Sequence, residues 1–499
     1  MSTPKNPASE LRALADLING AVAQIEAACS SRSQTFPPAD EQFTLESEAA
    51  RMSPDILMQS NVIVAASQQL ISAVRLPALT LMITALTPYI TACLRLSISL
   101  HVPEILREAG PQGLHVRDIA AKTNVDPAKL ARVLRLLATS HIFREVTPDT
   151  FANNRVSSLI DTYKPVSTIL EHPEDKFDST SGIAAILEHV TDEGSKSAAW
   201  LTETVTDKKI GFSQEPNETA FNKAFGTQLA MFPWLELPEN ILRLKRFALG
   251  MKGTQSMAPP SNILQGFDWK DLPKGSVVVD VGAGSGHHSL VLAKTHQHLE
   301  FVIQDRDAVI PDAVKHWGTE LPEAIKVGRV KFQGNSASRE NLVIAHGNRP
   351  AHDFFTPQPV KEPAVFLLRM VLHDWSDKYA TMILKQLRAA ASPHTQLLVI
   401  DFTMQYACED TTSARQIPGA VLPLPPAPLL ANKGTGDVLP YCADLNIMAL
   451  CNGEERTLSH FQKLFEGAGW KLSRVNYTPG VELENTKIFA VPIMPATSQ

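Results

Sequence analysis

The amino-acid sequence predicts an α/β domain with a Rossmann-like, mostly parallel sheet, preceded by an all-α region with a winged-helix segment. From about residue 275 onward, short apolar stretches alternate with helical patterns, which indicates a parallel sheet. The first of these stretches runs directly into a glycine-rich turn and an amphipathic helix at 277–293. Residues 114–156 combine two short helices with a hairpin-like stretch, which is typical of a winged helix.

The composition is ordinary and leaves room for two or three domains. The chain has 499 residues, a net charge of −6, 44% hydrophobic residues and 20% charged residues. This charge provides no global field that recruits nucleic acid or an anionic membrane. The N-terminus carries no apolar signal core, and the cysteines are scattered without metal-ligand spacing: Cys29, Cys93, Cys408, Cys442 and Cys451. We therefore expect a cytoplasmic protein in a reducing compartment.

The chain divides into three expected parts. Residues 1–60 form a helical, partly mobile segment, residues 61–200 a helical and winged-helix domain, and residues 201–499 the α/β domain. Between 60 and 110, apolar residues recur at helical spacing with little charge. A helix of this kind cannot bury itself on all sides, so we expect the region to mediate a homodimer.

Residues 76–94 lack charge and nearly reach the length of a membrane span. Pro77 and Pro88 interrupt this stretch, and several threonines lie within it. These features favour a buried helix, and we expect no membrane association.

The winged-helix segment has two interpretations, DNA binding or a structural role. Lys129, Arg132 and Arg135 form the only basic cluster in it, and no basic arm flanks them. We therefore favour a structural module that supports a dimer and a substrate lid, and we expect no nucleic-acid partner.

Six apolar stretches predict the strands of the α/β domain. They are residues 277–281, 301–304, 330–333, 365–369, 397–401 and 488–491. The proline-rich stretch 416–440 predicts a long loop, which we expect over the active site.

The glycine-rich turn predicts a nucleotide-like cofactor. Asp280 ends the first strand, and Gly282, Gly284 and Gly286 follow at alternate positions. Turns of this kind let a ligand approach the backbone closely. The preceding acid and the G-x-G-x-G spacing favour S-adenosylmethionine (SAM) over a dinucleotide.

Two further acidic positions fit an adenosine group. Asp305 lies about twenty residues past the glycines at a strand end, where it is placed to accept hydrogen bonds from ribose hydroxyls; Asp307 is the near competitor. Asp353 and Phe354 offer an acceptor for an adenine amino group and an apolar face for the ring. The polar segment 335–350 before them has the character of an insertion.

A second motif, at 367–377, delivers a histidine to the edge of the predicted sheet. His373 and Asp374 follow an apolar strand, at the edge where open α/β sheets bind ligands. Methyl transfer from a sulfonium to a hydroxyl requires a nucleophile near alkoxide, and a phenol with a pKa of ~10 needs a base at neutral pH. Histidine suits that task.

The two motifs together resemble the plant-type and fungal family of SAM-dependent small-molecule O-methyltransferases, which includes caffeate and hydroxyindole O-methyltransferases. The resemblance covers roughly 60–490 and is closest to fungal members at 266–269, 351–355, 372–377 and 455–457. It implies a methyltransferase catalytic domain at 201–499 and a small hydroxylated, aromatic or polyketide-like acceptor.

The resemblance also implies a role for each matching residue. His373 matches the general base, Glu455 a carboxylate that orients it, and Asp401 the other such acid, one methylene shorter than in plant members. The cofactor positions are Asp280, Gly282, Gly284, Gly286, Asp305, Asp353, Phe354 and Arg369, of which Arg369 replaces a lysine that holds the polar end of SAM. The substrate positions are Phe247, Met251, Asp374 and Trp375. No cluster offers obvious magnesium ligands, so we expect a metal-independent reaction.

Three alternatives remain at this level. The first is a winged-helix regulator that binds SAM as an effector, and the second is a non-catalytic relative whose adenine pocket is broken by the insertion at 335–350. The third is a dinucleotide-dependent oxidoreductase, which the glycine spacing disfavours.

Overall fold

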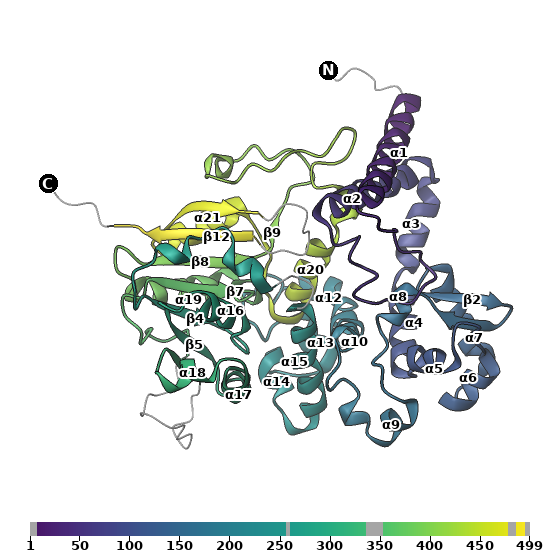
Figure 1. Cartoon of the computed structure of the whole chain (residues 1–499), viewed down its shortest axis with the longest axis horizontal. Helices are drawn as coiled ribbons and strands as arrows, with labels where there is room; N and C mark the ends of the chain where they lie inside the picture. Colours follow the sequence, from purple (N-terminus) through teal and green to yellow (C-terminus); the bar gives the residue numbers. More distant parts are fainter. Residues whose placement is uncertain (1–6, 256–259, 336–352, 478–485, 495–499) are drawn as a thin grey trace.

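The computed structural model describes residues 7–255, 260–335, 353–477 and 486–494. Figure 1 shows the helical N-terminal half beside an α/β domain, with the connecting helices between them. The predicted order of an all-α region followed by a Rossmann-like domain is confirmed.

The α/β domain is built on a seven-stranded sheet with the order β11-β12-β8-β7-β4-β5-β6. Its strands are β4 (Val277–Val281), β5 (Glu300–Arg306), β6 (Val330–Asn335), β7 (Val365–Arg369), β8 (Gln396–Asp401), β11 (Trp470–Asn476) and β12 (Thr486–Pro492). Strands β4 to β8 pair in parallel, whereas β12 runs antiparallel to both β8 and β11. All six predicted strands are present. Strand β11 was missed because its charged residues, Lys471 and Arg474, belong to an edge strand.

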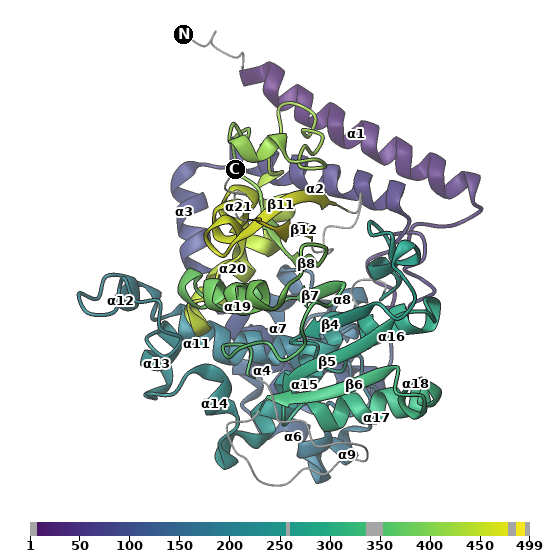
Figure 2. The same cartoon turned by 90° about the vertical axis from the view of Figure 1, so that its left-hand side faces the viewer.

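Helices cover both faces of this sheet (Figure 2). Helices α19 (Asp377–Ala390) and α21 (Leu458–Gly467) pack on one face, and α16 (His287–Thr295) and α17 (Ile310–Glu320) pack on the other. The buried side chains of α19, Ala380, Ile383, Leu384 and Leu387, follow the helical period. The central strands are buried on both faces, which explains their continuous apolar runs.

The winged-helix prediction is confirmed. Helices α6 (Val116–Thr123) and α7 (Pro127–Thr139) precede the hairpin β2 (Phe143–Thr147) and β3 (Thr150–Asn153), and β1 (Leu114–His115) completes a small sheet. Arg135 donates to Asp149 at 2.6 Å and to Glu145 at 2.8 Å, so the one basic cluster is partly neutralised within the module.

In the part of the chain that the structure describes, five helices precede this module: α1 (Pro7–Ser31), α2 (Pro54–Val74), α3 (Pro77–Leu86), α4 (Pro88–Ser99) and α5 (Val102–Ala109). The expected boundary at residue 60 falls inside α2. The polar stretch between α1 and α2 is held by Arg155, whose Nη1 donates to Ser47 Oγ at 2.7 Å and to Glu48 Oε1 at 2.5 Å.

The prediction that residues 76–94 form a buried helix is wrong for α3 within the single chain. Leu79, Leu81 and Met82 are 52%, 73% and 60% exposed. By length and composition, Pro77–Ser99 is the one helical stretch among the described residues that could cross a membrane. The C-terminal end of α4 is different, because Ser97 and Ile98 are buried in the fold.

The two halves are joined by short helices and one long helix, α15 (Ile241–Gln255), which carries Phe247 and Met251. Gly250 lets α15 approach Ile186 of α10, since an added Cβ would lie 3.0 Å from the backbone of Ile186. The other elements are α8 (Arg155–Ser158), α9 (Val166–Glu171), α10 (Ile183–His189), the π-helical turn η2 (Val190–Gly194), α11 (Ser195–Ala198), α12 (Leu201–Val205), α13 (Ala220–Phe225), α14 (Met231–Leu235), α18 (Pro322–Lys326), β9 (Thr403–Met404), α20 (Leu439–Cys451) and β10 (Arg456–Thr457).

The proline-rich stretch at 416–440 is largely a loop, as predicted. Its first part contacts β11, since Val475 N donates to Pro418 O at 2.9 Å. Its later part reaches α2, where Gln69 Nε2 donates to Pro428 O at 2.9 Å. These contacts tie the α/β domain to the N-terminal helices; a position over the active site stays a prediction.

Candidate active site

The glycine turn after β4 forms a backbone cradle at the carboxyl edge of the sheet. Gly282, Gly284 and Gly286 all have left-handed backbones, with φ of 71°, 58° and 69°. A Cβ at Gly282 would lie 2.7 Å from Val371 Cγ2, and one at Gly286 would lie 2.8 Å from Trp317 Nε1, whereas nothing lies within 4 Å of one at Gly284. Two glycines therefore permit close packing, and Gly284 borders open space that fits a ligand.

Asp305, at the end of β5, joins this cradle. Its Oδ2 accepts from Gly284 N at 2.7 Å, and its Oδ1 accepts from Arg306 N at 2.7 Å. Burial raises the pKa of Asp305 above its usual range. Asp307, the competitor, is exposed and lies beside Gly334 instead. The carboxylate of Asp305 beside Gly284 thus fits a ribose, because its remaining lone pairs can accept from hydroxyl donors.

We expect Asp305→Ala to weaken SAM binding by roughly 10- to 100-fold, because it removes the carboxylate that we predict to accept from two ribose hydroxyls. Calorimetric titration of SAM measures this effect. Asp307→Ala is the matched control, with the affinity of the unmodified protein. Unchanged affinity in Asp305→Ala, with a loss in the control, would transfer the ribose contact to Asp307.

Asp280 and Arg369 lie at the carboxyl ends of neighbouring strands. Asp280 is buried and accepts from Ser289 Oγ of α16 at 2.5 Å; burial raises its pKa to about 7. It is therefore engaged in holding α16 against β4. Arg369, at the end of β7, lies in the electrostatic field of Asp280 and Asp401, and its burial lowers its pKa.

Phe354 belongs to an aromatic group with Phe355, Trp375 and Tyr379. The Phe354 and Trp375 ring centroids are 5.8 Å apart, and those of Phe355 and Trp375 are 4.9 Å apart. Trp375, predicted at the substrate, therefore lies beside the residue predicted for adenine. Asp353 is exposed, and its Oδ1 accepts from Phe355 N at 3.0 Å. Of the expected insertion at 335–350, residues 336–350 lie outside the described residues.

A buried amide network anchors the segment that carries Phe354. Gln304 Nε2 donates to Gln333 Oε1 at 2.7 Å and to Gln358 Oε1 at 2.9 Å, and Gln358 Nε2 returns a bond to Gln304 Oε1 at 3.0 Å. This network could not be predicted from the sequence, because isolated glutamines are usually exposed.

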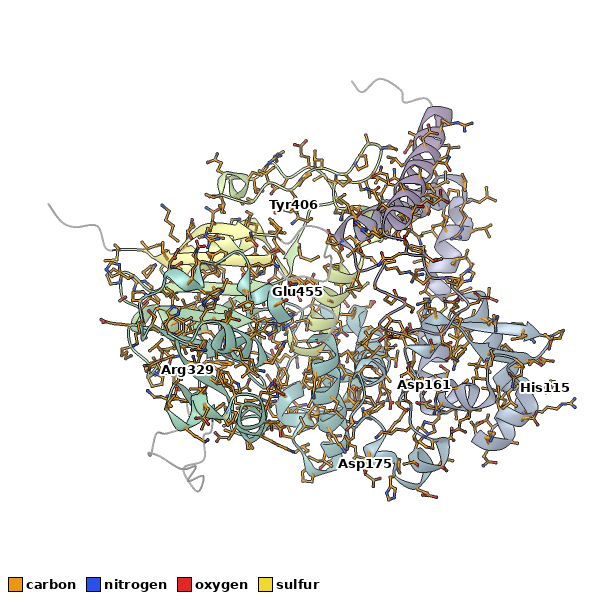
Figure 3. All side chains as sticks on the ribbon, viewed as in Figure 1. His115, Asp161, Asp175, Arg329, Tyr406 and Glu455 are labelled. Atoms are coloured by element: carbon orange, nitrogen blue, oxygen red, sulfur yellow. The ribbon has the colours of Figure 1, made fainter. Side chains whose placement is uncertain are left out.

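His373 lies in the turn η6 (Leu372–Asp374) that follows β7. Its Nδ1 is 2.7 Å from Glu455 Oε1, and its Nε2 is 3.5 Å from Asp374 Oδ1. Despite burial, the nearby carboxylates of Glu455, Asp374 and Asp401 raise the pKa of His373 to about 10. The histidine thus has an acid at each ring nitrogen, and Glu455 makes the short contact. Figure 3 shows Glu455 where the sheet meets the helical part of the chain.

Asp401 is fully buried at the end of β8, and both of its oxygens lack a hydrogen-bond partner among the described residues. Burial raises its pKa to about 6. The structure therefore places Glu455, and not the shorter Asp401, in contact with His373.

Phe247 and Met251 lie on α15, and the Phe247 ring packs in a different hydrophobic cluster from Trp375. The Phe247 ring packs edge-on against His189 at 5.1 Å and against Phe232 at 5.9 Å. The two aromatic residues predicted to line the acceptor thus belong to different packing groups.

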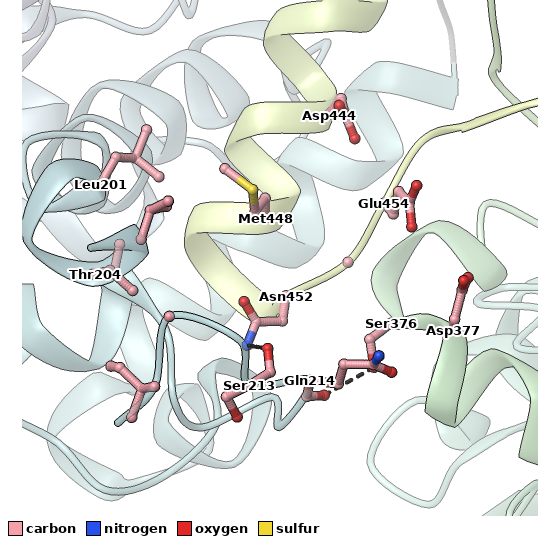
Figure 4. A pocket seen from close by; sticks show the side chains of 15 residues that line it. Leu201, Thr204, Ser213, Gln214, Ser376, Asp377, Asp444, Met448, Asn452 and Glu454 are labelled. Carbon is pink, nitrogen blue, oxygen red and sulfur yellow. Dashed lines mark hydrogen bonds between the residues drawn. The ribbon is translucent and has the colours of Figure 1, made fainter. Parts of the chain in front are cut away.

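A cavity of about 370 Å³ is lined in part by Gly453 and Glu454, the two residues before Glu455. Its lining includes Leu201, Ser213, Asp377, Met448 and Glu454 (Figure 4), and none of the predicted site residues borders it. Gly453 separates it from the histidine, since an added Cβ there would lie 2.2 Å from His373 O.

Asp377, Glu454 and His460 form a cluster that the sequence did not reveal, with ligand atoms within 4.8 Å of one another. His460 Nε2 is 2.6 Å from Asp377 Oδ2, and its Nδ1 is 2.8 Å from Glu454 Oε1. Both acids raise the pKa of His460 to about 9, which indicates an ion-paired imidazolium. The expectation of a metal-independent reaction stays a prediction.

The fold and the site together define a SAM-dependent methyltransferase of the Rossmann-like class. Residues 206–471 match the O-methyltransferase domain, and residues 84–161 match the O-methyltransferase dimerisation domain. An O-methyltransferase of Armillaria gallica is 41% identical over 489 residues, which cover 97% of this chain and 100% of that protein. A 4-O-methyltransferase of Phanerochaete chrysosporium is 39% identical over 488 residues, which cover 97% and 99%. The chain belongs to the O-methyltransferase family.

Solved structures share the fold. The mitomycin 7-O-methyltransferase has a TM-score of 0.57 at 20% identity, covering 83% of this chain and 98% of that one. A pericyclic reaction enzyme has a TM-score of 0.61 at 18% identity, covering 96% and 99%. At these identities the likeness concerns the fold alone, and the activity rests on the family.

The protein is therefore a SAM-dependent O-methyltransferase of secondary metabolism that acts on a small molecule. The alternatives of a winged-helix regulator and of a non-catalytic relative that binds SAM are not favoured. The dimerisation domain indicates a homodimer, for which the exposed apolar side chains of α3 and α4 are suited.

Proposed function

We propose that the protein methylates a phenolic or enolic hydroxyl of a small aromatic or polyketide-like metabolite, with His373 as the general base. The observation that carries this proposal is the 2.7 Å contact between His373 Nδ1 and Glu455 Oε1. In the neutral imidazole, this contact keeps the proton on Nδ1 and leaves the lone pair of Nε2 for the acceptor hydroxyl.

The electrostatics of the site suit a phenolic acceptor. The surrounding carboxylates raise the pKa of His373 to about 10, near the value of ~10 for a phenol. Proton transfer between such groups is nearly balanced, and the imidazolium that forms is stabilised by Glu455. Such a base contributes typically ~10²- to 10⁴-fold to the rate.

The cofactor residues have separable tasks in this proposal. When bound, SAM supplies an electrophilic methyl group on a sulfonium. Asp305 and the Gly284 cradle bind the ribose, Asp353 and Phe354 bind the adenine, and Arg369 binds the carboxylate end. Trp375 lies on the adenine side because it packs beside Phe354.

The acceptor is held by Asp374 and by α15. Asp374 lies on the Nε2 side of His373, at 3.5 Å, and so faces the hydroxyl that is deprotonated. Phe247 and Met251 offer an apolar wall. Alignment of the acceptor oxygen with the methyl carbon contributes ~7 kcal/mol or more in favourable cases.

We expect kcat/KM to rise with pH from neutral toward pH 10. A general base works only when it is neutral, and the pKa of His373 is raised to about 10, so the active fraction grows as pH approaches that value. Rates measured over a range of acceptor concentrations at saturating SAM give kcat/KM at each pH, and the rise on the low-pH side, the acid limb, tests this expectation. A profile that is flat between pH 7 and pH 9 would contradict a raised pKa at the base.

The test is a transfer assay with methyl-labelled SAM and a panel of phenolic acids, polyketide phenols and flavonoids. We expect labelled ether products with the unmodified protein and at least a 100-fold loss in His373→Gln, whose calorimetric SAM affinity stays intact. Pre-methylated analogues of each accepted compound are the controls. Near-normal turnover by His373→Gln, or transfer to carboxylates only, would end the assignment of His373 as base.

A further inference from the structure

Arg456 contacts the turn that carries His373, and its side chain is fully buried. Its Nη1 donates to Leu372 O at 3.0 Å, and its Nη2 donates to Trp375 O at 2.6 Å. These two carbonyls flank His373 and Asp374 on either side. One guanidinium therefore spans the turn between them.

The remaining contacts of Arg456 complete its hydrogen bonding. Nη1 also donates to Glu454 O at 3.2 Å, and Nε donates to Asp377 Oδ1 at 2.9 Å. A buried cation is strongly destabilising unless its donors are paired, so this arrangement persists only while the turn keeps its shape. The planar fork of arginine reaches two carbonyls at once, which the single ammonium of lysine does not do.

The same short segment also supplies Glu455 to the histidine. Glu454 N donates to His373 O at 2.8 Å, and Glu455 N donates to Asp444 Oδ1 of α20 at 2.8 Å. Strand β10, which contains Arg456, pairs with β9 at Thr403. Residues 454–456 thus contact the His373 turn through backbone, carboxylate and guanidinium, and a shift of the turn changes all three contacts together.

We propose that Arg456 is a positioning residue that holds the turn 372–375 so that the imidazole of His373 meets Glu455 and presents Nε2 to the acceptor. This inference rests on the proposed role of His373. The hydrogen bonds of Arg456 go to Asp377 and to the carbonyls of Leu372, Glu454 and Trp375, so Arg456 acts through the histidine turn.

His460 provides a matched control. It bonds the side chains of Asp377 and Glu454 but not the carbonyls of the turn. Replacement of His460 removes its two partly exposed ion pairs, with Asp377 and Glu454, and leaves both bonds of Arg456 to Leu372 and Trp375 in place.

The experiment compares Arg456→Lys with His460→Gln by kcat, KM, SAM affinity, melting temperature and the pH–rate profile. For Arg456→Lys we expect kcat to fall at least tenfold, with KM and SAM affinity within threefold, and the acid limb to move to lower pH as the Glu455 contact weakens. For His460→Gln we expect kcat within twofold. If Arg456→Lys does not fold, Arg456→Gln, whose amide still reaches one carbonyl, takes its place.

A double-mutant comparison separates this inference from the proposed function. If Arg456 acts through His373, Arg456→Lys causes no further loss of kcat in a His373→Gln background. Losses that multiply, an unmoved acid limb, or a kcat that follows melting temperature in both variants would overturn the positioning role. A His373→Gln variant with full activity would instead overturn the proposed base.

Discussion

Replacement of Glu455 by leucine lowers kcat by roughly 10³-fold, with SAM affinity unchanged, because the imidazole loses both its orientation and the charge that stabilises imidazolium. Leucine has a similar volume, so the buried site keeps its packing. His373 Nδ1, now 2.7 Å from Glu455 Oε1, is then left without an acceptor in a buried place. Single-turnover kinetics with saturating SAM measure the chemical step directly.

Glu455→Gln separates the contribution of orientation to kcat from the contribution of the negative charge. The amide oxygen still accepts from Nδ1, so orientation is kept, but the hydrogen bond is no longer assisted by charge, which costs about 1–2 kcal/mol or roughly tenfold. We expect the pKa of His373 to fall and the acid limb of the pH profile to move down. Asp401→Asn is the comparison, because Asp401 has no hydrogen bond to His373, and we expect it to cost less than Glu455→Gln. The reverse order would make Asp401 the orienting acid.

The sheet and the glycine turn could be predicted because their determinants are local. Val277–Val281 is a β-branched run, and the glycines after it need left-handed backbones that other residues avoid. Strand β11 has no such signal, since its burial alternates irregularly and its partner β12 lies later in the chain. Edge strands of this kind are fixed by tertiary packing.

The candidate site divides in the same way. His373 and Asp305 follow directly from strand ends, but the contact of His373 with Glu455 joins residues 82 positions apart and was implied only by resemblance. Arg456, the residue after Glu455, lies in the stretch 455–457 that resembles the fungal members, but the sequence alone predicted no role for it. Only the structure shows that its guanidinium spans the histidine turn.

The exposed helix α3 has a different cause. Its apolar residues led to the prediction of burial, and the single chain leaves them exposed. An apolar sequence pattern predicts that a surface is shielded from water, but it does not predict whether the same chain or a partner shields it. The adjoining dimerisation domain makes a second subunit the expected cover.

Gly286→Ala is expected to lower mainly the stability of the fold, and Gly284→Ala mainly the affinity for SAM, because the two glycines have different surroundings. Both have positive φ, so an alanine costs about 1–2 kcal/mol of backbone strain at either position. At Gly286 the added Cβ also meets Trp317 Nε1 at 2.8 Å and Ile303 Cγ2 at 3.3 Å. Overpacking there adds about 1–3 kcal/mol. We therefore expect the melting temperature of Gly286→Ala to fall by roughly 5–15 °C.

At Gly284 nothing lies within 4 Å of the added Cβ, so the melting temperature falls by only roughly 2–4 °C. The methyl group instead enters the space beside Asp305, which bonds Gly284 N at 2.7 Å. We expect SAM affinity to fall at least tenfold, measured by calorimetry below the melting transition. If Gly284→Ala binds SAM normally, the open space beside Gly284 is not where the cofactor lies, and the ribose contact assigned to Asp305 fails with it.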